Sequence, residues 1–275
     1  MTLKQGALSK IYTGLMFAFL YIPIVVLIVF SFNESKSRNV FTGFTLKWYG
    51  ELFKNEMVLK ALLVTLVVAA ISSVVATVLG TAAAVGISAM KKWPRFVVMN
   101  TTYIPVVNPE IVTGVSMLLL FVVIRTFLST IGIETDMGIG TLILAHITFN
   151  LPYVILSVSP KLRQMDKHIY EAALDLGCNR YQAFFKVVIP EIMPGIMTGF
   201  LMALTYSIDD FVISYFTSGT AQTLPIAIFS MTRRKVSPEI NALSTLLFVV
   251  VLLLLIVTNY HDIKSENKLE KEKRV

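Results

Sequence analysis

The chain is organised as long apolar runs separated by short polar stretches. Each run is at least as long as the roughly 20 residues that a helix needs to cross about 30 Å of hydrocarbon. We therefore predict an all-α membrane protein, a single transmembrane domain with six transmembrane helices. The predicted helices cover residues 11–33, 61–90, 96–124, 137–160, 191–217 and 240–260. An even number of helices places both ends of the chain on one side of the membrane.

Two of the runs contain acidic side chains. Asp209 and Asp210 lie within "LTYSIDDFVISYF" of the fifth run, and Glu110 lies in the third. One ionised Asp at the centre of a membrane helix costs about 2.5–3.5 kcal/mol, so these carboxylates need a compensating reason. Adjacent helical residues point about 100° apart. We therefore expect one aspartate to face a pathway and the other to bond a neighbouring helix or subunit.

The third run is predicted to break near the middle of the membrane. Asn108 is a good helix cap, and Pro109 suits the first position of a restarting helix, where its missing N–H is not needed. Broken backbone at that depth is tolerated where it is buried in protein or lines a water-filled cavity. Glu110 is therefore expected on a pathway; complementing the positive end of the restarted helix is the alternative, and the two roles are compatible.

Other features of the runs predict packing rather than chemistry. Ala76, Gly80 and Ala84 lie four residues apart on one face of the second run, which favours close approach of another helix. His146 in the fourth run is a lone imidazole in a helix, for which a proton relay is the alternative to a packing role. We expect it to be a hydrogen-bonded packing residue. No catalytic residue and no metal site is predicted.

The charged residues predict the orientation of the chain. It has 24 Lys and Arg against 17 Asp and Glu, a formal net charge of +7, and 55% hydrophobic residues. Most basic residues lie in residues 1–10, 91–95, 160–190 and 261–275. The positive-inside rule places these segments and both termini in the cytoplasm, although "TRRK" at 232–235 departs from the trend. Because the basic residues are divided among short loops, no nucleic-acid partner is expected.

The loop over residues 161–190 is too polar to span a membrane, yet it is strongly patterned. Asp166 can cap a short helix that ends near Leu176, and Gly177 can adopt the left-handed conformation that ends a helix. Asn179 and Gln182 form a capping signature for a second short helix. An apolar stripe at helical spacing follows on that helix; its members are Tyr181, Phe184, Phe185 and Val188.

This loop resembles a known motif. Glu171, Ala172 and Ala173 are followed at fixed spacing by Gly177 and by Pro190, which is similar to the "EAA" loop in permease subunits of binding-protein-dependent ABC importers. Val187 and Ile189 stand where that pattern usually has Ile and Leu, and both keep its apolar character. Five further segments resemble the spermidine and putrescine permeases of this family; they are "FTGFTLKWY", "NPEIVTGVS", "HITFNLPYV", "SIDDFVISYF" and "VSPEINALST".

The resemblance implies a MetI-like permease fold in the inner membrane of a bacterial cell. It also implies that the loop couples to an ATPase, with Glu171, Ala172, Ala173, Gly177 and Pro190 as coupling residues. The implied partners are a second permease subunit, two ATPase subunits, an extracytoplasmic polyamine-binding protein and membrane lipid. The chain has no "GxxxxGK[ST]" phosphate-binding loop, so ATP and Mg are expected on the ATPase and no cofactor is expected in this chain.

A cationic cargo would explain the intramembrane acids. No Lys or Arg lies in the middle of any apolar run. The ammonium groups of a polyamine could neutralise the carboxylates, and aromatic rings could stack against a cation. The predicted pathway residues are Glu110, Asp209, Asp210, Trp48, Tyr206 and Tyr215.

Three alternatives stay open. The chain could be a permease of the same family for another cargo. It could be a secondary transporter that couples to protons through the same carboxylates, although such a transporter has no ATPase to dock. Trp48 and Tyr49 could form an interfacial aromatic belt rather than a binding surface.

Overall fold

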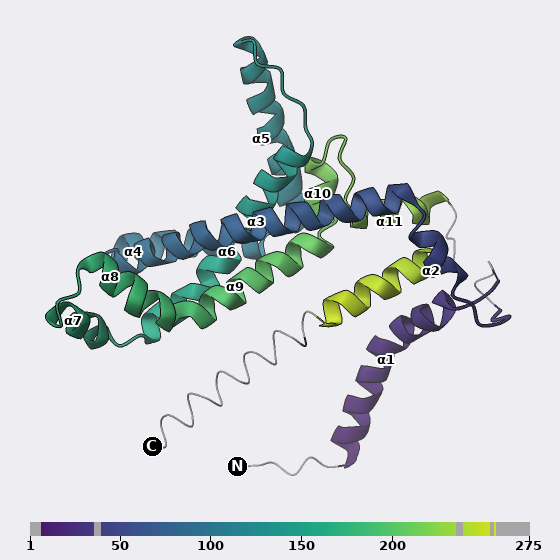
Figure 1. Cartoon of the computed structure of the whole chain (residues 1–275), viewed down its shortest axis with the longest axis horizontal. Helices are drawn as coiled ribbons and strands as arrows, with labels where there is room; N and C mark the ends of the chain where they lie inside the picture. Colours follow the sequence, from purple (N-terminus) through teal and green to yellow (C-terminus); the bar gives the residue numbers. More distant parts are fainter. Residues whose placement is uncertain (1–6, 36–39, 235–238, 254–255, 257–275) are drawn as a thin grey trace. The chain divides into compact units, whose positions relative to one another are not determined.

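The described part of the chain folds almost entirely into helices. The structure is a computed structural model, and it describes residues 7–35, 40–234, 239–253 and 256. Within these residues one isolated antiparallel bridge joins Asn33 to Phe44. In chain order (Figure 1) the elements are α1 (Ala7–Ser31), α2 (Lys47–Leu52), α3 (Glu56–Ala89), α4 (Lys92–Val107), α5 (Glu110–Thr130), α6 (Ile139–Gln164), α7 (Lys167–Asp175), α8 (Arg180–Ala183), the π-helical turn η1 (Phe184–Val188), α9 (Ile189–Asp209), α10 (Val212–Thr217) and α11 (Leu224–Arg234).

Within the described residues, five helical segments are long and apolar enough to cross a membrane, which confirms the predicted all-α membrane fold. They are Lys10–Ser31, Glu56–Ala89, Glu110–Thr130, Ile139–Gln164 and Arg180–Asp209. A shorter apolar helix covers Glu239–Leu253. The end of the predicted sixth span at residue 260 and the basic segment 261–275 lie outside the described residues.

The predicted third span, residues 96–124, is divided into α4 and α5. Asn108 has an extended backbone (φ −72°, ψ 139°), as the residue before a proline prefers. Pro109 occupies the N-cap position of α5 and Glu110 is its first helical residue. The helix is therefore broken as predicted, but its cap lies one residue later than assigned.

The chain divides into two compact units, each described by itself. Among the described residues, the first consists of those within 7–59 and 227–256, and the second of Lys60–Ile226. In the first unit, the indole nitrogen of Trp48 donates a hydrogen bond to the carbonyl oxygen of Asn33 at 2.7 Å. Trp48 is 3% exposed. This contact ties α2 to the end of α1.

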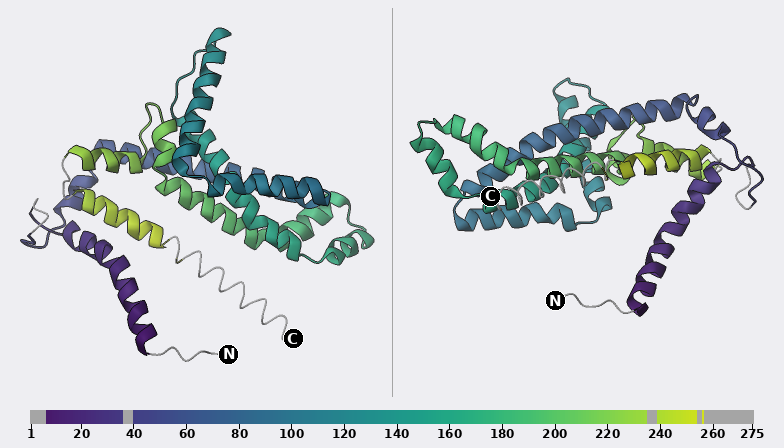
Figure 2. Two further views of the ribbon diagram at one scale, coloured as in Figure 1. Left: turned by 180° about the vertical axis from the view of Figure 1, so that it is seen from behind. Right: turned by 60° about the horizontal axis from the view of Figure 1, so that its bottom comes forward.

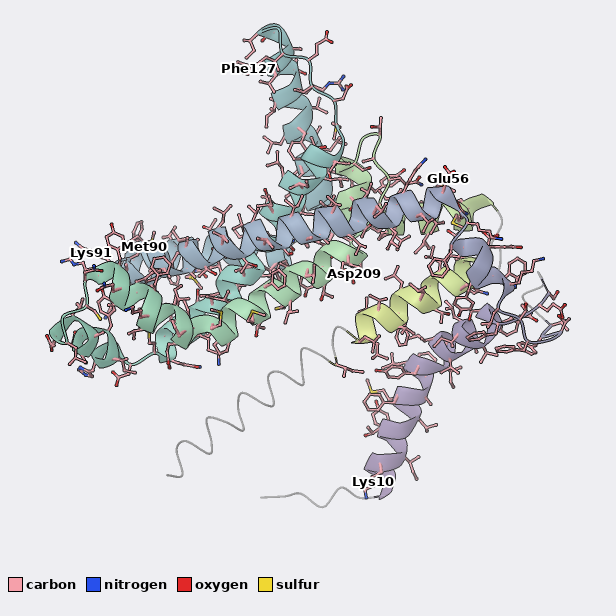
Figure 3. All side chains as sticks on the ribbon, in the orientation of Figure 1. Lys10, Glu56, Met90, Lys91, Phe127 and Asp209 are labelled. Carbon is pink, nitrogen blue, oxygen red and sulfur yellow. The ribbon has the colours of Figure 1, made fainter. Side chains whose placement is uncertain are left out.

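The second unit is built on a bundle of α3, α4, α6 and α9, from which α5 projects at a steep angle (Figures 1 and 2). α5 packs mainly against α10, and its Met117 and Phe121 also pack against a buried cluster that contains Ala145 and Phe149 of α6. Figure 3 shows Lys91 at the end of this unit that carries α7 and α8, and Asp209 farther along α9. The basic segments 91–95 and 160–190 therefore share one end of the unit.

Small residues let the bundle helices approach closely. A β-carbon added at Gly80 of α3 would lie 2.7 Å from the Val154 side chain of α6. On α9, Gly195 and Gly199 face α6 in the same way, and a β-carbon on Gly195 would lie 3.0 Å from the Ser157 carbonyl oxygen. This is the small-xxx-small packing typical of membrane helices. The packing face predicted for the second run is confirmed at Gly80.

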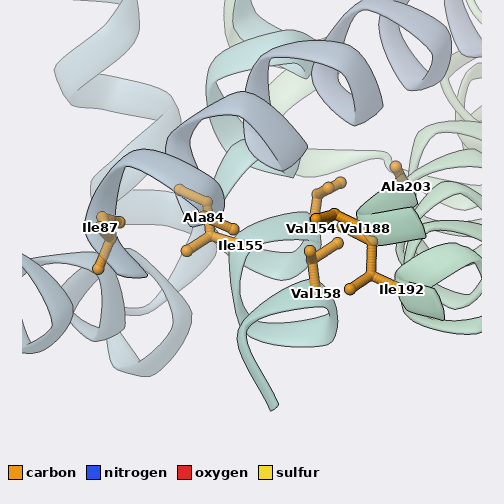
Figure 4. Close-up of a cluster of buried hydrophobic side chains, with 8 residues drawn as sticks. All are labelled: Ala84, Ile87, Val154, Ile155, Val158, Val188, Ile192 and Ala203. Carbon is orange, nitrogen blue, oxygen red and sulfur yellow. The ribbon is translucent and has the colours of Figure 1, made fainter. Parts of the chain in front are cut away.

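The apolar core of this unit lies where α3, α6 and α9 meet (Figure 4). Its buried members are Ala84, Ile87, Val154, Ile155, Val158, Val188, Ile192 and Ala203. Val188 belongs to the π-helical turn that precedes α9, so the same core anchors the α7–α8 segment to the bundle.

Candidate functional site

The fifth helix is interrupted at the aspartate pair. α9 ends at Asp209, Asp210 is extended (φ −63°, ψ 122°), and a new helix, α10, begins at Val212. The prediction of one helix to residue 217 was wrong. The physical reason is a side-chain cap: the Asp210 carboxylate accepts hydrogen bonds from the backbone N–H groups of Ser214 at 2.7 Å and Ile213 at 3.3 Å. These donors would otherwise be unpaired at the start of a helix.

The two aspartates have different surroundings. Asp209 is exposed, whereas Asp210 is 8% exposed. Oδ2 of Asp210 lies 3.6 Å from Nε2 of His146, which is itself 1% exposed. The same imidazole nitrogen lies 3.0 Å from the Ser214 hydroxyl. Asp210 is therefore a bonded structural group in this chain, and Asp209 is the aspartate available to a ligand.

Glu110 belongs to the same region as Asp209. Both residues are exposed, and they lie close enough for their charges to interact. The packing of α5 on α10 brings the two helix interruptions together, since a β-carbon on Gly114 would lie 2.8 Å from the Phe216 ring. Among the described residues, neither Glu110 nor Asp209 forms an ion pair with Lys or Arg.

Aromatic rings line α6 and α9 next to these acids. Tyr153 and Tyr206 have ring centroids 4.6 Å apart, and Phe149 lies 5.3 Å from Tyr153 and 6.3 Å from Tyr206. Tyr153 lies within electrostatic range of Glu110. Sequence reasoning selected Tyr206 but missed Phe149 and Tyr153. Their spacing of four residues in an uncharged helix was the available signal.

The other two aromatic candidates belong to different units, Tyr215 to the second and Trp48 to the first. Tyr215 is half exposed on α10, with its ring 5.5 Å from that of Phe211. Trp48 is buried in the first unit by its bond to Asn33, and the hydroxyl of Tyr49 lies 2.7 Å from that of Ser31. These contacts give Trp48 and Tyr49 packing roles within their own unit.

The loop that contains the EAA-like motif is closed by local caps. The Asp166 side chain accepts from His168 N at 3.0 Å, which caps α7 as predicted. At its other end, Cys178 N donates to Ala173 O at 3.0 Å. Gly177 has φ +90° and donates to Leu174 O at 2.9 Å, which completes a Schellman motif. The predicted glycine elbow is therefore present.

The capping pair after the elbow is also present. Gln182 N donates to Asn179 Oδ1 at 2.8 Å, and Asn179 N donates to Gln182 Oε1 at 3.1 Å. Glu171 lies exposed on α7, with Oε2 3.5 Å from Nδ1 of His168. Ala172 is exposed beside it, whereas Ala173 is buried. Glu171 and Ala172 thus offer an accessible helix surface.

The second short helix is not separate, contrary to prediction. α8, η1 and α9 form one continuous helical segment from Arg180 to Asp209. The π-helical turn directly precedes Pro190, which has no N–H to donate and whose ring would collide with a carbonyl of an ordinary α-turn. Widening the turn accommodates the proline without ending the helix.

The predicted apolar stripe on this helix is divided between two faces. Tyr181 is 80% exposed and Phe185 is also exposed, whereas Val188 is 6% exposed and lies in the core. The outward aromatic residues are thus left available for a partner.

Three comparisons with known proteins agree. The family described as "Binding-protein-dependent transport system inner membrane component" matches residues 76–262. The chain is 43% identical over 235 residues to the putrescine transport system permease protein PotI of Escherichia coli (strain K12), covering 84% of this chain and 82% of that protein. It is 36% identical over 257 residues to the spermidine/putrescine transport system permease protein PotC of the same strain, covering 93% and 92%.

The fold is also similar to a solved structure. A bacterial ABC transporter involved in the import of the acidic polysaccharide alginate matches with a TM-score of 0.70 and 18% sequence identity, over 92% of both chains. Since that transporter imports an acidic cargo, the shared fold does not determine the charge of what is carried. The charge preference must be sought in side chains.

Proposed function

Because this chain belongs to the inner-membrane permease components of binding-protein-dependent transport systems, we propose that it carries polyamines into the cell. The resemblance seen at the EAA-like loop is confirmed by this family. The chain is a multi-pass membrane subunit and not an enzyme. The family works with a binding protein, as its description states.

The observation that supports a polyamine cargo is the pair of exposed carboxylates at the two helix interruptions. Asp209 and Glu110 lie within reach of each other's charge and have no Lys or Arg partner among the described residues. Two negative charges in a membrane are costly unless a cation neutralises them. A linear amine with two or more ammonium groups supplies that cation, and it matches the cargo named for PotI and PotC.

The aromatic rings fit the rest of such a cargo. Methylene spacers between ammonium groups are apolar, and ring faces attract cations by about 0.5–2 kcal/mol. Tyr153 and Tyr206 lie next to the carboxylates, and Phe149 packs against both. The acids would fix the ammonium groups while the rings would hold the chain between them.

The energy for transport would come from a separate ATPase. We assign ATPase coupling to the α7–α8 segment, through Glu171, Ala172, Ala173, Gly177 and Pro190, and we expect two ATPase subunits and a second permease chain to complete the transporter. The exposed Tyr181 and Phe185 support this assignment, because large apolar side chains at a polar, non-spanning end favour a protein partner.

The test is uptake of labelled putrescine and spermidine by vesicles that contain the assembled transporter and its binding protein. We expect ATP-dependent uptake that disappears when the ATPase subunit is omitted. Uptake that continues without the ATPase, or an assembled transporter that rejects both amines, would refute the proposal.

Coupling is tested by Gly177→Val, with Gly132→Val as the matched control. Both glycines have positive φ, +90° and +82°, so a β-branched residue strains either turn. Only Gly177 lies in the proposed coupling segment. We expect Gly177→Val to separate ATP hydrolysis from uptake and Gly132→Val to leave the ratio of the two rates unchanged.

A further inference from the structure

We propose that His146 and Asn150 of α6 are positioning residues. By bonding the last turn of α9 and the first turn of α10, they keep these two helices separate at the interruption after Asp209. The Asn150 amide donates to the Ser207 hydroxyl at 2.8 Å, in the last turn of α9. His146 lies 3.0 Å from the Ser214 hydroxyl, in the first turn of α10. The two α6 residues are one helical turn apart and so share a face. α6 thus bonds the helices on both sides of the interruption.

The contacts continue beyond the two central residues. Thr141 of α6 donates to the Thr217 carbonyl oxygen at 2.8 Å, which fixes the end of α10. On the other side, the Ser207 hydroxyl lies 3.1 Å from the Ser72 hydroxyl, so α3 joins the network. Every bond in this network runs between helices that are far apart in sequence. The position of α10 beside Asp209 is therefore set by neighbouring helices.

The cap of α10 depends on the same network. A helix tends to continue, and an interruption leaves backbone N–H groups without partners. Asp210 satisfies two of them, but a buried carboxylate also needs a favourable electrostatic partner. With a proton on Nε2, His146 can donate to the Ser214 hydroxyl at 3.0 Å, and the same nitrogen lies 3.6 Å from Asp210 Oδ2, too far for a hydrogen bond but close enough to stabilise the carboxylate electrostatically. Loss of His146 would remove the support of the cap.

Packing alone does not account for these two side chains. Both are fully buried, and among the described residues His146 Nδ1 and Asn150 Oδ1 have no hydrogen-bond partner. A buried polar atom without a hydrogen-bond partner costs free energy, and apolar side chains of similar size would fill the space without that cost. The remaining atoms of the same side chains, Nε2 and Nδ2, are the ones that bond the two edges of the interruption.

The test is hydrogen exchange of the assembled transporter, read on peptides from residues 204–217. In His146→Leu we expect the amides of Ile213 and Ser214 to exchange about tenfold faster, equivalent to about 1.4 kcal/mol. The matched control is Thr148→Val on the same helix, because that hydroxyl bonds only its own helix at Leu144 O and is exposed. Unchanged exchange in His146→Leu would overturn the proposal.

A conservative variant separates positioning from general stability. In His146→Gln the side-chain amide nitrogen can replace Nε2, so we expect the backbone amides of Ile213 and Ser214 to exchange as slowly as in the wild type. Asn150→Leu should loosen the α9 side, at Ser207 and Ile208. Where His146→Leu lowers the yield of transporter, Ser214→Ala removes only the hydroxyl and should raise exchange about threefold. If His146→Gln and His146→Leu exchange equally fast, the hydrogen bond is not the cause.

The transport consequence rests on the proposed function, whereas the exchange result does not. We expect His146→Leu to lower the maximal uptake rate about tenfold with little change in the half-saturating concentration of the loaded binding protein, and His146→Gln to restore the rate. Normal maximal uptake with fast exchange would overturn the role in transport. A wild-type transporter that rejects polyamines would refute the cargo and leave the exchange result intact.

Discussion

The chain interrupts its membrane helices twice near the same place, by opposite means. Between α4 and α5 a single residue, Pro109, interrupts the helical backbone hydrogen bonds because it has no N–H. It also forces Asn108 into an extended conformation. Between α9 and α10 no proline or glycine is present. There a carboxylate caps the second helix, and polar side chains of α6 support both edges. One interruption is local and the other depends on the tertiary fold.

The two interruptions differ in whether the helix can become continuous again. A proline break is permanent, because the missing N–H cannot be restored in any conformation. A capped break consists of hydrogen bonds that can be exchanged for ordinary helical ones, so its opening can respond to movements of α6. Asp209 lies at the second kind of interruption and Glu110 at the first. A cargo held by both would meet one fixed and one adjustable group.

The largest effect is expected from removing the capping carboxylate. Asp210→Ala removes the acceptor of two backbone N–H groups and the buried carboxylate beside His146, which should destabilise the assembled transporter by about 3 kcal/mol. The measurement is the midpoint of thermal inactivation in detergent. Asp136→Ala is the control, because its ion pair with Arg125 is solvent-exposed and should contribute little. Equal losses in both variants would remove the distinction between the two interruptions.

The next effect concerns transport rather than stability. Asp209→Asn keeps the shape of an exposed side chain and removes its charge, so we expect uptake to fall about 30-fold, or about 2 kcal/mol. The thermal midpoint should not decrease, because the buried partners of Asp210 are untouched. Glu134→Gln, an exposed acid in the loop between α5 and α6, should transport normally. Normal uptake in Asp209→Asn would show that this carboxylate is not on the pathway.

A smaller effect is expected at the proline break. Pro109→Ala restores an N–H that can donate to the Pro105 carbonyl, so α4 and α5 should become more nearly continuous. We expect the amides of residues 110–113 to exchange about fivefold more slowly, or about 1 kcal/mol. Pro105→Ala, inside α4, is the control for losing a proline in general. Faster exchange in Pro109→Ala would contradict a break made by this residue alone.

The smallest effect is expected from Asp210→Asn. The two helix N–H groups bond different oxygens of Asp210, and the amide oxygen of Asn can still accept from one of them. Asn is in general as good a helix cap as Asp, so the loss should be about 0.5 kcal/mol. The same inactivation assay measures it. A loss as large as that of Asp210→Ala would mean that the charge, rather than the hydrogen-bond acceptor, holds the interruption.

These two interruptions also show what could be predicted from the sequence. Features made by neighbouring residues were found: the caps at Asp166 and Asn179, the elbow at Gly177, and the break at Pro109 within one residue. Each depends on a residue type with a strong local preference. The apolar runs likewise predicted the long helices, because a helix that crosses the membrane must be apolar along nearly its whole length.

Features made by distant residues were missed. At the end of α9, the local cap by Asp210 is supported by the imidazole of His146 on α6, and sequence spacing does not encode that long-range contact. His146 was expected to be a hydrogen-bonded packing residue, and its partners could not be named. Trp48 was predicted as a pathway residue, with an interfacial belt as the alternative, and its hydrogen bond to the Asn33 carbonyl oxygen was not foreseen. The coupling and pathway roles themselves stay predictions.

The uninterrupted helix from Arg180 to Asp209 has a mechanical consequence. Its 30 residues extend about 45 Å, from the face proposed to dock the ATPase to the acid proposed to hold the cargo. Because no loop lies between its ends, a displacement of one end can be carried to the other. The helix is least regular at the wide turn before Pro190 and at Pro194, both nearer the end proposed to dock the ATPase. A movement imposed at Tyr181 would therefore displace the whole helix and with it Asp209. The change in backbone angle would then occur beyond this helix, at the interruption formed by Asp210.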